Sequence, residues 1–363
     1  MRKTSPSLAL ALAVALSVVP LWTPASASTL AIRAEPLATG LAFPAGFTFA
    51  PDGRLFYGER YTGEVRILDP ATGFDSLFFT VPNLLTTGEK GLLGLAIHPA
   101  YPSAPYVYAW VTRTVSGTPR AQVLRIVDAG GSGSSMKAIW SGSVSEHHNG
   151  SRILFGPDGR LYVVTGDHAD PANSQDLTND YGKILRMTPG GGVPADNPFP
   201  GSRIWAYGIR NSAGFGFDPI TSELWETDNG PECNDELNRI IKGRNYGWGP
   251  TQTCATPPEP PLNTNQDGPS PVLPKRHYTP PIAPTGLAFC NGCGLGADAE
   301  NRLFFGDFND GNIRKVTLTP DRLRVQSQVV VYTHPSFVLG VEAAPDGSLY
   351  FSDSSGIYEL VMA

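Results

Sequence analysis

Two adjacent histidines stand out in the stretch SEHHNGSRILFGPDGRLYVVTGDHAD, which begins at Ser145. The pair is unusual because the 363-residue chain has only six histidines. A small-residue turn follows it, and then an apolar run with a Pro-Asp-Gly turn. A neutral imidazole can accept a proton near neutral pH, which makes His148 a candidate general base. The plainer interpretation is a histidine that hydrogen-bonds to a carbonyl group of the turn.

Two further stretches place polar side chains next to apolar or small residues. YGIRNSAGFGFDP carries Arg210 and Asn211, and a guanidinium group can bind an anionic or quinone ligand through two parallel hydrogen bonds. The alternative for this arginine is a structural salt bridge. TTGEKGLLGLAIHP carries Glu89 and Lys90 directly before an apolar strand, so a loop side chain there can point into a pocket.

An acidic stretch, ETDNGPECNDELNRIIKGRNYGWG, begins at Glu226. Calcium takes about six to eight oxygen ligands, which carboxylates and turn carbonyls can supply together. The stretch therefore indicates a calcium site, with a solvated acidic loop as the alternative. The side chains that suggest calcium are Asp228, Glu232, Asp235 and Glu236.

The chain repeats one unit six times. Each unit has an apolar strand, a turn rich in Pro, Asp or Gly, an alternating strand, a polar loop and another alternating strand. Pro fixes φ and Gly tolerates a positive φ, so Pro-Asp-Gly closes a hairpin. RLYVV and RLFYG alternate as half-buried strands do. The units begin at Phe49, Ile97, Phe155, Phe217, Gly296 and Ala343.

Six such units predict an all-β fold, a six-bladed β-propeller that forms one domain over residues 28–363. A β-sandwich of hairpins is the alternative, but it does not explain six similar units. We expect the segment TLAIRAEPLATGL to pair with the last blade, and the Pro-rich stretch Thr251–Pro284 to be a loop insertion. Loops of one propeller face converge on the central channel, so polar residues distant in sequence can meet there.

Residues 1–27 have the features of a signal peptide: the basic start MRK, the apolar run Leu8–Val19 and small residues near Ala27. The apolar run is shorter than the about 20 residues that span a bilayer. We therefore expect cleavage and a secreted or periplasmic protein without stable membrane insertion, rather than a membrane anchor. The net charge of −6 argues against a nucleic-acid partner.

Four cysteines in an exported chain suggest two disulfides, for which three pairings are possible. The most local choice joins Cys233 to Cys254 and Cys290 to Cys293. The motif CNGCG lacks the following histidine of a haem-attachment site and the second CxxC of a zinc site, so those interpretations are weak.

Together with YTPPIAPTGLAF, the stretches quoted above closely resemble the soluble pyrroloquinoline-quinone-dependent aldose sugar dehydrogenases of the glucose/sorbosone type. The resemblance runs in order from about Thr39 to the C-terminus. It implies a six-bladed propeller that uses pyrroloquinoline quinone and Ca²⁺. It also implies an aldose sugar as substrate and an external electron acceptor.

The resemblance implies roles for individual residues. His148 matches the general base that takes the proton of the anomeric hydroxyl, and His147 stands where relatives often carry an acid. Arg210 and Asn211 match a pair that contacts quinone and substrate, with Arg210 also stabilising the reduced cofactor. Glu89 matches a polar residue that lines the pocket of substrate and cofactor.

The resemblance also implies two calcium sites. Gly230 and Pro231 match the residues whose carbonyl groups bind the Ca²⁺ that bridges to the cofactor. Glu236 and Tyr246 match positions near a second, structural Ca²⁺.

One departure concerns the cations that hold the carboxylates of the quinone. Many relatives carry a lysine in the loop after the strand that corresponds to APTGLAF, and basic residues in a later loop. Here these loops read CNGCGLGAD and GDFNDGNIRK, with Asn309 and Asp310 in the second and Arg314 and Lys315 beyond them. The cations that could replace the missing ones are Lys90, Arg244 and Lys275.

The leading hypothesis is an exported quinoprotein that oxidises the anomeric carbon of an aldose to a lactone. A calcium-dependent lactonase is a second hypothesis, in which the acidic loop holds the metal and His148 activates water. The third is a sugar- or protein-binding propeller that has lost the cofactor, and the missing lysine motivates it.

Overall fold

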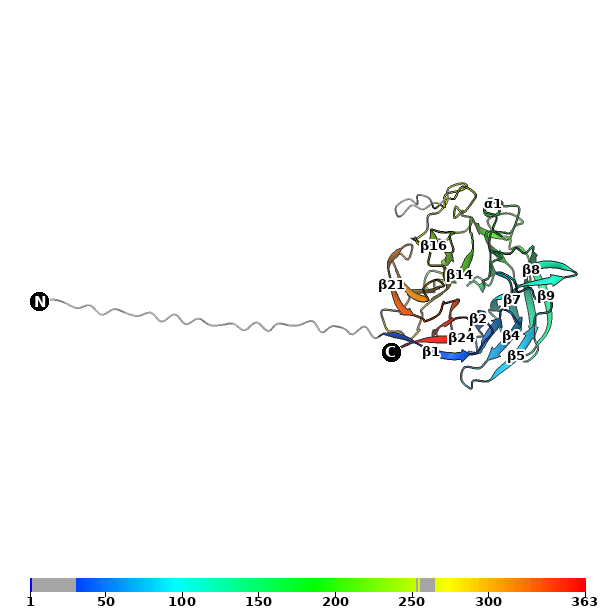
Figure 1. The fold of residues 1–363 in the computed structure, drawn as a ribbon, viewed down its shortest axis with the longest axis horizontal. Helices are drawn as coiled ribbons and strands as arrows, with labels where there is room; N and C mark the ends of the chain where they lie inside the picture. The colour runs from blue at the N-terminus through cyan, green and yellow to red at the C-terminus, as the bar shows by residue number, and fades with distance from the viewer. Residues whose placement is uncertain (2–30, 253, 255–264) are drawn as a thin grey trace. The chain divides into compact units, whose positions relative to one another are not determined.

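Six four-stranded antiparallel sheets surround a common centre in the computed structural model (Figure 1). The structure describes residues 1, 31–252, 254 and 265–363. The predicted six-bladed propeller is confirmed. The predicted signal peptide, residues 1–27, lies outside the described residues apart from Met1.

Each blade runs outward from the centre in chain order, except the last. The first three blades are β2 (Pro44–Phe49), β3 (Leu55–Glu59), β4 (Glu64–Leu68) and β5 (Asp75–Thr80); β6 (Leu92–Ile97), β7 (Tyr106–Val115), β8 (Thr118–Asp128) and β9 (Gly133–Gly142); and β10 (Ile153–Phe155), β11 (Leu161–Thr165), β12 (Lys183–Met187) and β13 (Ile204–Tyr207). The last three are β14 (Ser212–Phe217), β15 (Leu224–Asp228), β16 (Asp235–Ile240) and β17 (Arg276–Tyr278); β18 (Pro284–Phe289), β19 (Leu303–Asp307), β20 (Asn312–Leu318) and β21 (Val325–Thr333); and β22 (Gly340–Ala343), β23 (Leu349–Ser352), β24 (Gly356–Met362) and β1 (Ile32–Thr39). A short helix, α1 (Ala172–Gln175), lies between β11 and β12.

The ring closes as expected, because β1 pairs with β24 and completes the sixth blade with a strand from the other end of the chain (Figure 1). The Pro-Asp-Gly turns join the first two strands of blades 1, 3 and 6. Their glycines, Gly53, Gly159 and Gly347, all have positive φ and each donates to the carbonyl three residues before it at 2.9 Å. The local turn chemistry therefore forms the hairpin that the repeat predicts.

The second strands differ from the expected half-buried pattern. β11 and β19 are buried at every position, and β3 is buried at all but its last. The reason is that each blade packs against a neighbour on both faces, so neither face of an inner strand meets solvent.

The inner strands crowd at the axis, and five of them carry a glycine there. A Cβ would collide with the next blade at Gly46, Gly94, Gly214 and Gly286, and at Gly340 it would lie only 3.0 Å from Arg152 and Phe47. In blade 3 the corresponding place holds Arg152. Its buried guanidinium donates to the carbonyls of Ala213 and Leu339, both at 2.8 Å. One arginine thus occupies the space that the glycines leave free and ties three blades together.

Thr251–Pro284 is not wholly a loop, because Arg276–Tyr278 forms β17, the fourth strand of blade 4, and pairs with β16. The two disulfides are Cys233–Cys254 and Cys290–Cys293, as the most local pairing predicted. Among the described residues, none of the helices is long and apolar enough to cross a membrane.

Candidate active site

The candidate site lies at the end of the blades where first strands begin and second strands end, which we call the site face. The pairing of Ser212 with Asp228 and of Pro284 with Asp307 shows that these ends coincide. Loops entering the first strands of blades 2, 3 and 4 carry the predicted residues Glu89, His148 and Arg210. Residues far apart in sequence therefore meet on one face, as a propeller predicts.

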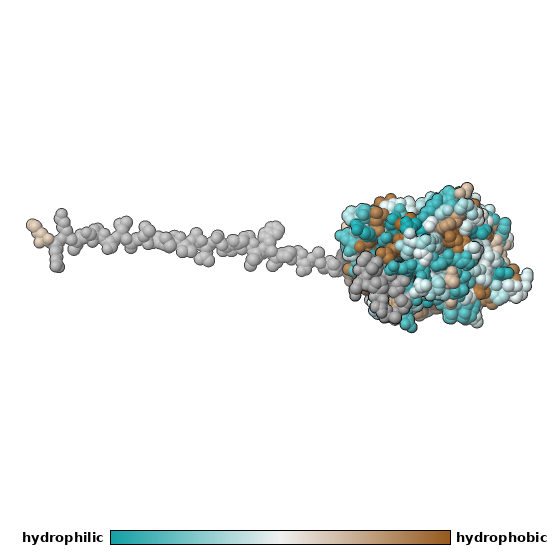
Figure 2. All heavy atoms as spheres, turned by 90° about the horizontal axis from the view of Figure 1, so that it is seen from above, coloured by the Kyte–Doolittle hydropathy of each residue, from teal (hydrophilic) through white to brown (hydrophobic). Residues whose placement is uncertain are grey.

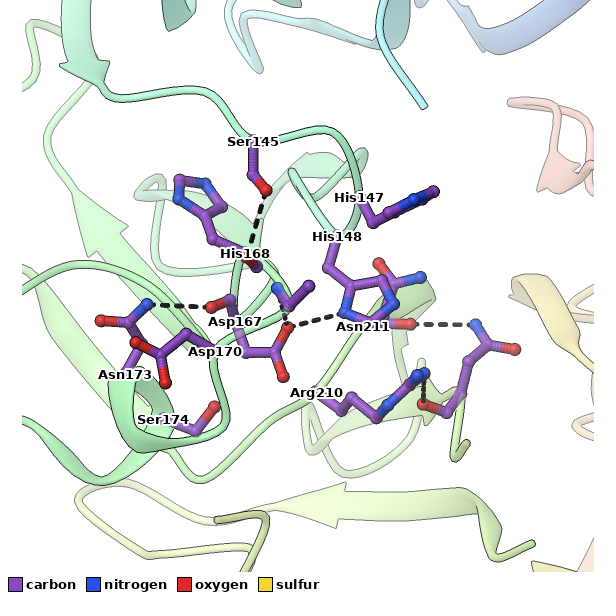
Figure 3. Close-up of polar contacts among 12 residues, drawn as sticks. Ser145, His147, His148, Asp167, His168, Asp170, Asn173, Ser174, Arg210 and Asn211 are labelled. Atoms are coloured by element: carbon purple, nitrogen blue, oxygen red, sulfur yellow. Dashed lines mark hydrogen bonds and ion pairs between the residues drawn. The ribbon is translucent and has the colours of Figure 1, made fainter. Parts of the chain in front are cut away.

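His148 and Asp167 form the centre of the site (Figure 3). The Nδ1 atom of His148 lies 2.6 Å from Oδ1 of Asp167. The exposed fractions of the two side chains are 12% and 1%, so the pair is largely shielded while the imidazole still meets solvent. A shielded carboxylate beside an imidazole can fix its orientation and tautomer.

The partners of Asp167 identify that tautomer. Oδ2 of Asp167 accepts a hydrogen bond from Nε1 of Trp248 at 2.7 Å, and Oδ1 accepts one from the backbone N–H of Ala169 at 2.8 Å. A carboxylate can only accept hydrogen bonds. His148 therefore donates through Nδ1–H, and its Nε2 lone pair is left to accept a proton.

The backbone that presents His148 is strained and closely packed. His148 has φ of 54°, the left-handed region that a residue with a Cβ rarely adopts. A Cβ at Gly166 would collide with the carbonyl of His148, so the TGD stretch needs glycine before Asp167. The backbone N–H of His148 donates to Oε2 of Glu89 at 2.6 Å, which compensates part of the strain.

His147 behaves differently from its neighbour. Its Nδ1 lies 3.5 Å from Oε1 of Glu89, and its side chain is 58% exposed. In Figure 3 its ring points away from Asp167. The doublet thus separates into one histidine held by a buried carboxylate and one on the surface beside Glu89.

Arg210 and Asn211 are held by one buried carboxylate, Asp228. Its two oxygens accept the backbone N–H groups of Arg210 at 2.8 Å and Asn211 at 2.7 Å. Burial raises the pKa of Asp228 to about 6, and the two N–H groups act in the opposite direction. The guanidinium of Arg210 also lies over the ring of Trp248, so Trp248 contacts both halves of the site.

The oxygens near Arg210 fit a bound cation. The carbonyls of Asn229 and Gly230 accept from Nη1 of Arg210 at 2.8 Å and 3.0 Å, and each carbonyl oxygen has a second lone pair. Oδ1 of Asn229 is buried and lacks a hydrogen-bond partner in the described part of the chain. Carbonyl and amide oxygens are ligands that Ca²⁺ accepts, and the exposed Pro231 lies on the same turn.

Glu236 and Tyr246 belong to a separate part of blade 4. Glu236 accepts from Asn238 at 2.8 Å and from Asn265 at 2.7 Å, whereas the hydroxyl of Tyr246 bonds to the backbone of residues 239 and 241. Burial, and then the nearby Asp228, raise the pKa of Glu226 well above its usual range. Two buried acceptors, Oε1 of Glu226 and Oδ1 of Asn238, have no hydrogen-bond partner among the residues described. This oxygen-rich cluster fits a structural Ca²⁺.

Other acidic residues have structural partners. Asp235 accepts backbone N–H groups of Gly230, Ile282 and Ala283, and Glu232 is exposed. Within the described ranges no three His, Cys, Asp or Glu side chains gather to hold a metal ion.

Two of the cations considered in the sequence, Lys90 and Arg314, lie on the site face. Lys90 is buried on the site face and pairs with Glu146 at 2.5 Å, and Arg314 pairs with the buried Asp307 at 2.9 Å. Arg244 bonds to the carbonyl of Ser270, and burial lowers the pKa of Lys275.

The CNGCGLGAD loop lies between β18 and β19 at the opposite end of blade 5, because Phe289 pairs with Leu303 there. A lysine in it would not reach the site face, so its absence costs the site nothing. Arg210 is in direct contact with the predicted cofactor donors.

Asp167 and Trp248 are residues of the candidate site that the sequence interpretation did not single out. Asp167 directly follows an apolar strand in TGDHAD, which is where a propeller loop begins, so its position was a usable signal. Trp248 is 81 residues from Asp167 in the chain, and no local pattern connects them.

A six-bladed propeller that gathers a histidine–carboxylate pair, an Arg-Asn pair and carbonyl oxygens on one face has a site suited to proton transfer beside a cation. The family model for glucose/sorbosone dehydrogenases matches residues 41–361, so the chain belongs to this family.

Similar proteins extend over most of the chain. An uncharacterised protein of Synechocystis is 31% identical over 88% of this chain and 83% of its own length. The aldose sugar dehydrogenase YliI of Escherichia coli is 26% identical over 91% of this chain and 92% of its own. The solved structure of the pyrroloquinoline-quinone-bound aldose sugar dehydrogenase of Streptomyces coelicolor is 27% identical, with a TM-score of 0.76 over 91% of this chain and 97% of that one.

Proposed function

We propose that this protein is an exported quinoprotein dehydrogenase that oxidises the anomeric carbon of an aldose to a lactone. The observation that carries the proposal is the His148–Asp167 pair, which leaves one imidazole nitrogen free to accept a proton. The same face bears the carbonyl oxygens that contact Arg210. Membership of the family and the names of its relatives support the same activity.

His148 acts as the general base. Its Nδ1–H is held by Asp167, so Nε2 takes the proton of the anomeric hydroxyl and the positive charge that forms is stabilised by the carboxylate. As the O–H bond breaks, C1 loses its hydrogen with the bonding electron pair and the C1–O1 double bond of the lactone forms. Ionised Asp167 keeps the imidazole in position throughout, because Trp248 and Ala169 hold the carboxylate.

The residues around Arg210 would hold the cofactor. The carbonyls of Asn229 and Gly230 and the side-chain oxygen of Asn229 are the oxygen donors for a Ca²⁺, and Arg210 and Asn211 would contact the quinone. When bound, pyrroloquinoline quinone supplies the electrophile that accepts the hydride, with Ca²⁺ as a Lewis acid. Electrons would then leave to an external acceptor.

Arg210 would stabilise negative charge near these donors. Its guanidinium is fixed by two carbonyls and by Trp248, so it needs no rearrangement when charge develops. Asp228 fixes the backbone of the Arg-Asn pair.

Export is supported by the signal-like N-terminal sequence and by two disulfides, which form in oxidising compartments. Fractionation of cells that express the full chain tests it. Cleaved protein in the periplasm or medium is expected, and an uncleaved cytoplasmic protein would contradict export.

The activity is tested by adding Ca²⁺ and pyrroloquinoline quinone to purified protein and following dye reduction with a panel of aldoses. Reduction that needs sugar, quinone and Ca²⁺ together is expected. An enzyme that reduces no dye with any aldose at saturating quinone would refute the proposed function.

A further inference from the structure

Four aromatic rings form a continuous strip on the site face, which we call the aromatic lip: Phe43, Tyr61, Phe308 and Phe337. Successive ring centroids lie 5.3 Å apart from Tyr61 to Phe43, 6.1 Å from Phe43 to Phe337 and 4.4 Å from Phe337 to Phe308. The rings come from four separate loops, which enter β2 and β22 and follow β3 and β19. The chain thus brings aromatic residues of blades 1, 5 and 6 together at one place.

The lip is presented to solvent although its rings contact one another. Tyr61 is 49% exposed and Phe308 is 43% exposed, at the two ends of the strip. Phe43 has φ of 60°, a conformation that is unfavourable for a bulky residue. Strain of this kind concentrates where a side chain must be held for binding. Folding alone would be better served by burying these rings.

Arg60 connects the lip to the site of chemistry. Its guanidinium lies 5.0 Å from the ring centroids of both Phe43 and Tyr61. The same guanidinium donates to the carbonyls of Gly88, at 2.5 Å, and Lys90, at 3.0 Å. These residues flank Glu89, whose carboxylate accepts the backbone N–H of His148. The lip is therefore continuous with the loop that positions the proposed base.

We propose that the aromatic lip is a carbohydrate subsite that binds sugar units next to the one that is oxidised. The inference rests on the proposed function and gives its substrate class, the reducing end of an oligosaccharide. Pyranose rings have apolar C–H faces that stack on aromatic rings, while their hydroxyls point outward to polar groups. The lip offers aromatic rings and polar groups together. Exposed polar residues follow two of the rings directly in the chain: Thr62 after Tyr61, and Asn309 and Asp310 after Phe308.

The surroundings favour a neutral polar ligand over a lipid or an apolar protein segment. The charged groups at the lip have partners: Arg60 bonds to two carbonyls, Glu59 accepts from Ala42 and Thr62, and Asp310 lies 4.0 Å from Arg314. On the side of the propeller drawn in Figure 2, hydrophobic residues form patches among hydrophilic ones. A narrow row of rings fits a row of sugar rings, whereas a membrane or a large protein partner needs a broader apolar area.

The test measures binding without oxidation and without quinone. The probes are the methyl glycosides of maltotriose, cellotriose and xylotriose, whose blocked anomeric carbon cannot be oxidised, with methyl glucoside and methyl xyloside as one-unit controls. Calorimetry should show at least one trisaccharide binding about tenfold or more tightly than its monosaccharide. Saturation-transfer NMR should place the contact on the rings beyond the first.

The variants separate the lip from the rest of the surface. Tyr61→Ala combined with Phe308→Ala should remove the tighter binding of the trisaccharide and leave the monosaccharide unchanged. Phe74→Ala is the matched control, because Phe74 is an exposed phenylalanine between β4 and β5, at the other end of blade 1. Equal affinity for one and three units in the wild type, or an unaffected double variant, would overturn the subsite.

Two outcomes distinguish this proposal from others. Binding of the trisaccharide without any dye reduction by aldoses would keep the subsite and refute the proposed oxidation. Sedimentation of the wild type, but not the double variant, with phosphatidylglycerol–phosphatidylcholine vesicles, and no trisaccharide preference, would assign the lip to a membrane and overturn the proposal.

Discussion

The two sides of the site face are built in contrasting ways. On the side of blades 3 and 4, His148, Asp167 and Arg210 are fixed by short hydrogen bonds to buried partners. On the side of blades 1, 5 and 6, the aromatic lip has rings in contact with rings and little directional bonding. Directional bonds fix atoms where a proton must move, whereas ring contacts tolerate ligands that differ in detail. The contrast matches the proposed division between chemistry and recognition.

Arg152 joins the two sides. Its guanidinium donates to the carbonyl of Ala213, just after Asn211, and to the carbonyl of Leu339, two residues after Phe337. The buried arginine at the axis thus holds the start of β14 on one side and the loop before β22 on the other, so the contrast lies within one connected structure.

The largest effect is expected for His148→Gln. The amide fills similar space but cannot take the proton, so turnover should fall by about 10²–10⁴-fold. Calcium and quinone binding should persist, because the proposed ligands lie near Arg210. Steady-state dye reduction measures turnover, and quinone absorbance measures binding.

His147→Gln is the matched control, since its side chain is exposed and points away from Asp167. Its turnover should stay close to wild type. A larger loss in this variant than in His148→Gln would show that His148 is not the base.

Asp167→Asn should have the next largest effect. The asparagine amide can donate to Nδ1 of His148, which would shift the ring proton to Nε2 and block the base. We expect turnover to fall by about 10²-fold or more, with a smaller change in KM. Histidine nitrogen NMR shifts report the tautomer directly. A variant that keeps the Nδ1–H tautomer and wild-type turnover would show that Asp167 is only structural.

The sequence predicted most of the fold because each repeat carries its own turn. Pro-Asp-Gly closes three of the hairpins locally, and the six units map onto the six blades. Two-sided burial of β11 and the strand β17 were not predicted, since both depend on packing between and within blades rather than on local pattern.

The site was predicted in part. His148, Arg210, Asn211 and Glu89 do meet on one face, because their motifs carry recognisable residue types. The lip was not predicted. Its rings are single aromatic residues in four loops, so only the closed ring of blades brings them together.

Lys183→Met should have a moderate effect, confined to the side of blades 3 and 4, which we call the chemical side. The ammonium group is buried and bonds to the carbonyls of Asn173, Ser174 and Tyr181 in the loop that carries Asp167, and the side chain of Asn173 bonds to the carbonyl of Asp167. Burial lowers the pKa of Lys183 to about 7, and the nearby carboxylates of Asp176 and Asp180 act in the opposite direction. Methionine removes these three hydrogen bonds of the ammonium group, so the free energy of unfolding should fall by about 1–3 kcal/mol.

If this loop positions Asp167, the same variant should also lower kcat while trisaccharide binding at the lip stays unchanged. Urea denaturation, kinetics and calorimetry test the three expectations. Weaker trisaccharide binding together with unchanged kcat would contradict the division between the two sides.

The smallest effect is expected for Glu342→Gln, which tests the connection between the two sides. Glu342 lies on β22, two residues from Gly340, and burial raises its pKa to about 7, with Arg152 acting in the opposite direction. The unfolded carboxyl has a pKa near 4.5, so between these values the folded state holds a proton that the unfolded state has lost. Stability of the wild type should therefore fall as pH rises through this window, whereas glutamine cannot ionise and should not show the loss. At pH 8 the variant should have a Tm higher by a few degrees, and at pH 4 the two should be nearly equal. A variant that is less stable at pH 8 would mean that ionised Glu342 stabilises Arg152 at the axis. The link between the chemical side and the lip would then depend on this carboxylate as well as on the carbonyls of Ala213 and Leu339.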